Sequence, residues 1–263
     1  MIQLRQYKIA ALSLSLFGNI ALPFWERFAI SECKIPDLEI TILPQNYGKY
    51  GMEKFILEGE EVLCFRHEAE VMFTDQNWKK IQILPPVNRD HIDAFLVQIF
   101  HTHALRRRMI QLHCSTVDAE GWGILFLGPS GIGKTTQAEL WHTYRGAKII
   151  NGDIGFVQET KDAFLAWGTP WHGSSPYCEN TFVPIRAMVV LKQAQTNHIR
   201  KLEGFEKVKE VSDSVFYPTW LENGMDLCLS VLDQLLCHIP VYELSCRPDE
   251  EAVRITEEVI WNG

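Results

Sequence analysis

The sequence predicts an α/β (α+β) fold in which a phosphate-loop domain follows a β-rich N-terminal part. Three observations support this. An apolar run at 124–127 leads into a glycine-rich loop and then into a helix-forming run at 137–141. Strand and helix patterns alternate from about residue 110 onward. Before residue 85, short strand patterns are separated by turn signals.

The N-terminal part contains several candidate strands and no grouping of catalytic residue types. The candidate strands lie near 9–17, 37–43, 53–58, 61–66, 70–74 and 79–84. A Pro-Pro pair at 85–86 ends the series of strand patterns, and a helix is expected over about 91–107. We therefore expect two parts: residues 1–88, for recognition of a substrate or partner, and residues 89–263, for nucleotide binding and catalysis.

The second part is expected to begin with a strand from residue 110, followed by a turn at 119–123 and a second strand that leads into the loop. After the loop helix, further elements are expected in this order: strand 147–150, hairpin 155–159 and 163–167, strand 185–191, helix 224–238, strand 241–246 and a helix that ends near 261.

The loop matches glycine, four residues, glycine, lysine and threonine, which is a phosphate-binding pattern. Glycines let successive backbone N–H groups point at phosphate oxygens, at the positive end of the following helix. In this pattern Lys134 reaches the β- and γ-phosphates, and the Thr135 hydroxyl takes a site on Mg²⁺. The predicted phosphate-binding residues are Gly128, Ser130, Gly131, Ile132, Gly133, Lys134, Thr135 and Thr136.

Phosphoryl transfer also needs a carboxylate for the metal and a group that receives the proton of a hydroxyl acceptor. Asp153 follows the strand after the loop helix, so a neighbouring strand would bring its carboxylate beside Thr135. His113 lies on the strand before the loop strand. By itself it would more often be a histidine of the core.

Composition excludes several classes of function. The formal charge of −8 leaves no basic stripe for nucleic acid, and no run reaches the ~20 apolar residues that span a bilayer. Seven cysteines form no C-x-x-C pair, which favours free thiols in a reducing cytoplasm. A homo-oligomer is left open.

The motifs from 112 to 153 resemble the C-terminal catalytic domain of bacterial HPr kinase/phosphorylase. The resemblance rests on Leu112-His113, the loop at 128–135, residues 145–147 and Asp153. That family shares its ATP-site architecture with ATP-dependent phosphoenolpyruvate carboxykinase. It includes smaller HPr-kinase-like proteins, some of which phosphorylate a serine of a precursor peptide. The resemblance implies that His113 orients groups at the γ-phosphate and that Asp153 is the metal ligand, the base, or both.

Two departures from the family pattern matter. The family carries two adjacent aspartates, and the first is replaced here by Gly152. Residues 167–173 stand where the family has an Arg-Gly signature associated with dephosphorylation, so the reverse, phosphorylase activity is not supported.

The leading hypothesis is an ATP- and Mg²⁺-dependent kinase that acts on a hydroxyl, above all a serine of a peptide or small protein. The alternatives are a small-molecule kinase, for instance of free serine, and a nucleotide switch or plain ATPase whose N-terminal part binds a partner. The sequence leaves open the acceptor, the preference for ATP or GTP, and whether Asp153 or His113 is the base.

A long loop over 168–177 contains too many helix and strand breakers to form an element. Loops of this length in compact domains are often functional. Trp171, His172 and Ser174 are therefore expected to cover a substrate. The alternative is a surface loop whose tryptophan packs on the core.

Overall fold

A computed structural model describes residues 3–18, 22–31, 33–42, 53–57, 60–67, 70–84 and 89–262. The chain divides into two compact units, Met1–Ala104 and Leu105–Gly263. This division falls in the last turn of helix α1 (Arg89–Arg106), whereas the sequence pattern placed that whole helix with the second part. The helix is held within the first unit by a hydrogen bond between His103 Nε2 and the Trp78 carbonyl.

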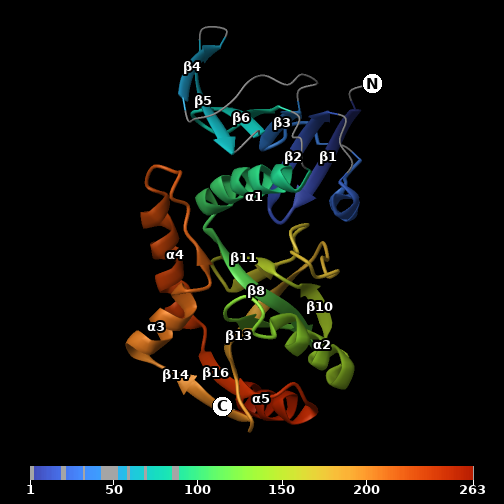
Figure 1. Cartoon of the computed structure of the whole chain (residues 1–263), viewed down its shortest axis with the longest axis vertical. Coiled ribbons are helices and arrows are strands. Elements are labelled where there is room, and N and C mark those ends of the chain that lie inside the picture. The colour runs from blue at the N-terminus through green and yellow to red at the C-terminus, as the bar shows by residue number, and fades with distance from the viewer. Residues whose placement is uncertain are drawn as a thin grey trace. The chain divides into compact units, whose positions relative to one another are not determined.

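The first unit is built on a seven-stranded sheet, as expected from its β-rich sequence (Figure 1). Its spatial order is β1, β2, β3, β7, β6, β5 and β4, and a 3₁₀ helix η1 (Pro23–Phe28) follows β2. The strands are β1 (Gln3–Ile9), β2 (Leu12–Gly18), β3 (Leu38–Ile42), β4 (Glu53–Leu57), β5 (Glu60–His67), β6 (Glu70–Asp75) and β7 (Lys80–Ile83).

The single strand expected over 9–17 is wrong. Ile9 pairs with Leu12, so β1 and β2 form an antiparallel hairpin with a two-residue turn. Ala10 adopts the left-handed conformation there, with φ of 50°. Glycine or asparagine ordinarily marks such turns, and neither is present, so the local sequence carried no signal for the hairpin.

The second unit contains a nine-stranded mixed sheet and four helices. The three strands β9, β13 and β16 run parallel, and β8 runs antiparallel beside β9. The strands are β8 (Met109–Ala119), β9 (Trp122–Leu127), β10 (Lys148–Asn151), β11 (Ile154–Glu159), β12 (Phe164–Trp167), β13 (Phe182–Gln193), β14 (His198–Leu202), β15 (Val215–Phe216) and β16 (Val241–Cys246). The helices are α2 (Lys134–Arg145), α3 (Gly204–Ser212), α4 (Gly224–His238) and α5 (Glu250–Asn262).

The α/β fold class is confirmed, and the predicted order of elements in this unit is found with small shifts. One shift concerns Pro184, which was expected to precede its strand. It lies inside β13, opposite Leu165 of β12. Elements α3, β14 and β15 were not predicted from the sequence.

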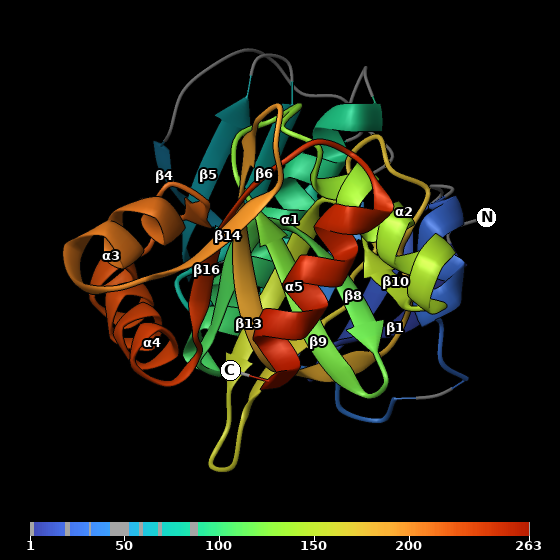
Figure 2. The same cartoon turned by 90° about the horizontal axis from the view of Figure 1, so that it is seen from below.

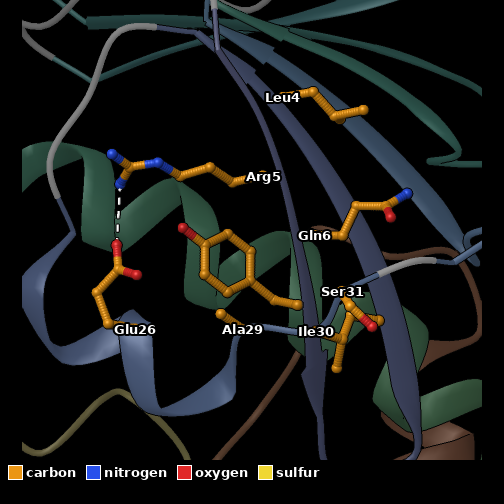
Figure 3. A pocket seen from close by; sticks show the side chains of 8 residues that line it. Leu4, Arg5, Gln6, Glu26, Ala29, Ile30 and Ser31 are labelled. Carbon is orange, nitrogen blue, oxygen red and sulfur yellow. Dashed lines mark hydrogen bonds and ion pairs between the residues drawn. The ribbon is translucent and has the colours of Figure 1, made fainter.

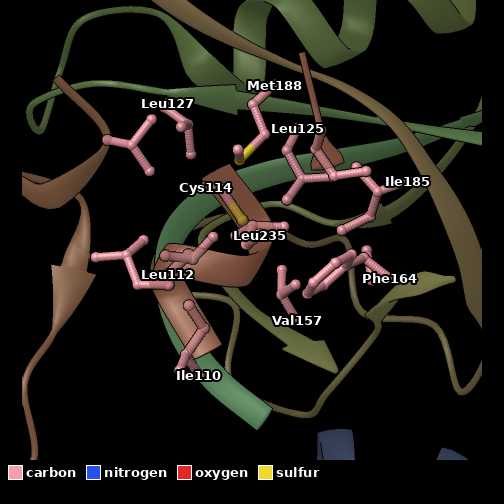
Figure 4. Packing of buried hydrophobic residues seen from close by; sticks show 14 of the residues in the cluster. Ile110, Leu112, Cys114, Leu125, Leu127, Val157, Phe164, Ile185, Met188 and Leu235 are labelled. Carbon is pink, nitrogen blue, oxygen red and sulfur yellow. The ribbon is translucent and has the colours of Figure 1, made fainter. Parts of the chain in front are cut away.

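Helices cover both faces of the parallel strands, and the alternation of apolar residues explains why. Leu125 and Leu127 of β9 point into a cluster that includes Leu235 of α4 (Figure 4). Ile124 and Phe126 point to the other face, against residues of α2 and α5. Figure 2 shows α5 and α2 on one side of these strands and α4 with α3 on another. Because both faces are buried, the strands read as continuous apolar runs.

The carboxyl ends of the three parallel strands meet at one edge of the sheet. Leu127 at the end of β9 pairs with Val190 of β13, and Gln193 at the end of β13 pairs with Cys246 of β16. Ligands of open α/β sheets bind in the crevice outside such an edge.

Candidate functional site

The phosphate loop connects β9 to α2, with the strand and helix flanks that the motif requires. Gly128, Gly131 and Gly133 have φ values of 135°, 77° and 115°, which other residues rarely adopt. Gly133 is the N-cap of α2, so the loop ends at the positive end of the helix dipole. This backbone geometry suits an anion.

Lys134 is buried at the base of the loop. Its Nζ donates hydrogen bonds to the carbonyls of Gly128, at 3.1 Å, and Pro129, at 3.3 Å. Burial lowers the pKa of this ammonium group, and the nearby Asp153 carboxylate partly opposes that shift. The lysine is therefore held inside the loop and has an anionic side chain close by.

Thr135 connects the start of α2 to the corner between β10 and β11. Its hydroxyl donates to the Gly152 carbonyl at 3.2 Å, and the Ser115 hydroxyl donates to the same oxygen at 2.8 Å. Gly152 immediately precedes Asp153, so these bonds fix the phosphate loop next to the predicted carboxylate.

Asp153 and His113 form a direct pair, with Nε2 and Oδ1 3.0 Å apart. β11 pairs with β8 so that Ile154 lies opposite His113, and this register brings the two side chains together. The hydrogen bond from His113 lowers the pKa of Asp153 despite partial burial, and the charges of Lys134 and His172 add to the shift. The structure thus brings together His113, Lys134, Thr135 and Asp153.

Asn151 fastens the 168–177 loop to this site, and sequence reasoning missed it. Its side chain is fully buried. Its Nδ2 donates to the carbonyls of Thr169, at 3.1 Å, and Trp171, at 2.9 Å. Its Oδ1 accepts hydrogen bonds from the backbone N–H groups of Asp153 and Ile154. One amide therefore fixes both the loop and the carboxylate.

The loop packs directly on Asp153 and Gly152. A Cβ atom placed on Gly173 would lie 2.4 Å from Asp153 Oδ2. A Cβ atom placed on Gly152 would lie 1.9 Å from Ser175 Oγ. Glycine at 152 is thus a packing requirement in this conformation, and Ser175 occupies the space that a side chain there would need.

The three loop residues expected over a substrate have different positions. Trp171 is buried, with its ring centroid 6.2 Å from that of Phe156. His172 is buried as well, and its Nδ1 hydrogen-bonds with the Ser175 carbonyl. Ser174 is exposed at the tip of the turn. In this conformation, Ser174 is the one of the three whose side chain is open to solvent.

A pocket of about 580 Å³ lies beside the phosphate loop, at the carboxyl ends of β13 and β16. Local motifs gave no signal for it, because its walls come from three distant segments. It is lined by Gly131, Ile132, Gly133, Thr136, Gln137, Leu191, Lys192, Gln193, Ala194, Gln195, Cys246, Arg247 and Pro248.

The first unit has a pocket of its own, of about 330 Å³, between β1 and the segment after η1 (Figure 3). Arg5 and Glu26 form an ion pair of 3.0 Å at this pocket. The Tyr7 side chain is fully buried in its wall. This pocket was not predicted from the sequence.

Among the described residues, no group of three or more His, Cys, Asp or Glu side chains is arranged to hold a metal ion. Within the residues that the structure describes, no helix is both long enough and apolar enough to cross a membrane. All seven cysteines lie in the described ranges, and no disulfide joins them there.

Two curated proteins that are similar to this chain in sequence are both named HPr kinase/phosphorylase. An HPr kinase/phosphorylase from Mycoplasmopsis pulmonis (strain UAB CTIP) is 23% identical over 211 residues, covering 75% of this chain and 62% of the relative. An HPr kinase/phosphorylase from Lachnoclostridium phytofermentans is 30% identical over 100 residues, covering 38% of this chain and 28% of the relative. The chain thus spans less than two thirds of the length of either relative.

No family model matches the chain. Among solved structures, the HPr(Ser) kinase/phosphatase from Coxiella burnetii aligns with 57% of this chain and 93% of its own. Its TM-score is 0.33 at 10% identity, which is too low to transfer structural detail. The curated relatives, together with the motifs of residues 112–153, support a likeness between this chain and the HPr kinase/phosphorylase family.

Proposed function

We propose that the chain is an ATP- and Mg²⁺-dependent kinase that transfers the γ-phosphoryl group to a hydroxyl, above all a serine of a peptide or small protein. The observation that carries this proposal is the convergence of the phosphate loop with the Asp153 and His113 pair. Thr135 donates a hydrogen bond to the Gly152 carbonyl, and Asp153, which pairs with His113, is the next residue in the chain. The proposed phosphate-binding and proton-accepting groups therefore share one site.

Phosphate binding is assigned to the loop and Lys134. The backbone N–H groups of the loop and the dipole of α2 attract the phosphates. The Lys134 ammonium, which now donates to two carbonyls of the loop, is in place to neutralise phosphate oxygens. In-line positioning and charge neutralisation supply most of the catalysis of phosphoryl transfer.

Mg²⁺ fits the residues present. Thr135 Oγ1 and the Asp153 carboxylate are oxygen donors, and magnesium is commonly held by one or two protein oxygens with phosphates and waters. The Thr135 hydroxyl already bonds to an oxygen next to Asp153, so both donors belong to one small region. When bound, the ion neutralises charge on the β- and γ-phosphates.

The hydroxyl proton of the acceptor has two candidate destinations. Asp153 has a lowered pKa, which makes it a good ligand and a weak base. His113 lies 3.0 Å from it and takes the proton in our proposal, while Asp153 orients the imidazole ring. The reverse division of roles is tested by the variants described below.

A nucleotide switch is the second candidate, and the 168–177 loop favours it. Gly173 and Ser175 pack against Asp153 and Gly152, so the loop lies against one side of the carboxylate, which stays about a third exposed. In a switch, nucleotide binding would move this loop to signal to a partner. In a kinase, the same movement admits the acceptor.

We assign recognition of the acceptor to residues 1–88, and the pocket between β1 and η1 is the candidate contact there. We place the activity in the cytoplasm, where ATP is available and thiols stay reduced.

One experiment separates these functions. The protein is incubated with γ-labelled ATP, Mg²⁺ and fractionated cell extract, beside Lys134→Ala and Asp153→Asn controls. Label in a peptide or protein supports the kinase, and label in a small metabolite supports a small-molecule kinase. Label in inorganic phosphate alone supports the switch. If Lys134→Ala retains ATP binding by calorimetry, the phosphate-loop assignment is wrong.

A further inference from the structure

Several polar groups in the walls of the pocket beside the phosphate loop are bonded within the protein. The Ala194 N–H donates to the Cys246 carbonyl at 3.0 Å. Lys192 pairs with Glu210 at 2.6 Å, and the Arg247 guanidinium is bound to Asp249. Each of these three groups therefore has a partner within the protein.

Gln137 is the exception. It lies one turn into α2, and its side chain is only 3% exposed. Its Nε2 donates to Cys246 Sγ at 3.3 Å, whereas its Oε1 is buried with no hydrogen-bond donor. Leaving a buried acceptor without a donor costs free energy, so such atoms in native proteins call for an explanation.

The position of Gln137 suggests which donor is missing. The pocket lining includes Gly131, Gly133 and Thr136, so a nucleotide whose phosphates occupy the loop has this pocket within reach of its nucleoside. Adenine carries an amine donor at N6, whereas guanine carries the carbonyl acceptor O6 at the same ring position. Oε1 can accept from the amine and would face the carbonyl as a second acceptor.

Resting on the proposed function, we propose that this pocket takes the nucleoside of ATP and that Gln137 Oε1 selects adenine by accepting a hydrogen bond from its 6-amino group. In the structure Nε2 donates to Cys246 Sγ, and Oε1 is the amide atom left without a donor. A site with a fixed polar group rejects the analogue that cannot pair with it.

The test is a double-mutant cycle. It removes the 6-amino group of the ligand and the side-chain amide of Gln137, separately and together. Dissociation constants in Mg²⁺ are measured by calorimetry for ATP, for purine riboside triphosphate, which lacks only the 6-amino group, and for GTP. The wild-type protein is compared with Gln137→Met, which keeps the length of the side chain and removes the acceptor. We expect wild-type protein to bind ATP roughly three- to tenfold more tightly than the deamino analogue, the range for one net hydrogen bond. GTP should bind more weakly still, by roughly 5- to 100-fold relative to ATP.

In Gln137→Met, the ratio between ATP and the deamino analogue should fall to about one. Gln195→Met makes the same substitution at an exposed residue of the lining and should keep the wild-type ratio. A wild-type ratio near one, an unchanged ratio in Gln137→Met, or tighter binding of GTP than ATP overturns the adenine assignment and leaves the proposed kinase intact. Failure of wild-type protein to bind any nucleotide overturns both. The comparison of ligands on wild-type protein decides the matter even if Gln137→Met does not fold.

Discussion

Adding a single methyl group at Gly152 tests how tightly the 168–177 loop is packed over the site. In the structure, a Cβ atom there would lie 1.9 Å from Ser175 Oγ and 2.4 Å from Ser175 Cβ. Real atoms do not approach so closely, so either the loop or the β10–β11 corner must move. The backbone of Gly152 is not left-handed, so alanine meets no conformational penalty of its own.

The magnitude follows from the cost of overpacking a well-packed site, about 1–3 kcal/mol. For a unit of this size, that loss corresponds to a fall in Tm of roughly 2–12 °C. Ser175→Gly removes both clashing atoms. We therefore expect Gly152→Ala and Ser175→Gly to couple favourably in the double variant, by about 1–2 kcal/mol.

The assay is urea unfolding and scanning calorimetry of the full chain for the parent, both single variants and the double variant. Ser174→Gly serves as the matched control, because Ser174 is the exposed neighbour and its removal should not rescue Gly152→Ala. An unchanged stability of Gly152→Ala, or an equal rescue by Ser174→Gly, would refute the packing argument.

Three further predictions concern the same site. Asp153→Asn should abolish phosphoryl transfer, and His113→Ala should lower it by ~10²–10⁴-fold, as measured at saturating ATP and acceptor; near-normal turnover of Asp153→Asn would exclude its assigned role. Asn151→Ala should destabilise the protein by about 2–4 kcal/mol in urea unfolding, because it removes two buried and two partly buried hydrogen bonds to the backbone; a loss below 0.5 kcal/mol would contradict the anchoring role. The lowered pKa of Asp153 means that its contribution to stability is present above its unfolded pKa, about 3.9, and is lost as the pH falls through the folded value. Unfolding free energy should therefore decline less steeply below pH 4 in Asp153→Asn, and equal slopes would show that the pair does not contribute.

The amino-acid sequence by itself determined the location of the phosphate loop and the order of most elements in the second unit, with α3, β14 and β15 as the exceptions. Helix α4 begins and ends where its apolar period predicts, at Gly224 and His238. Such elements are visible because the signal is local: residue period, glycine spacing and helix-ending residues all lie within one short window. The nearness of Asp153 to Thr135 was also predictable, since it follows from the strand order next to the loop.

Only the tertiary structure decided the contacts between segments far apart in the chain. Asn151 reaches Trp171, Gly152 meets Ser175, and Gln137 meets Cys246 across 109 positions of sequence. The sequence separation within each pair follows no rule, because each contact depends on the path by which a long connection returns to the edge of the sheet. The β1 and β2 hairpin was not predicted, although its contacts are local in sequence. Its turn residue Ala10 has a left-handed conformation that alanine does not favour, and the pairing of the two strands stabilises the turn.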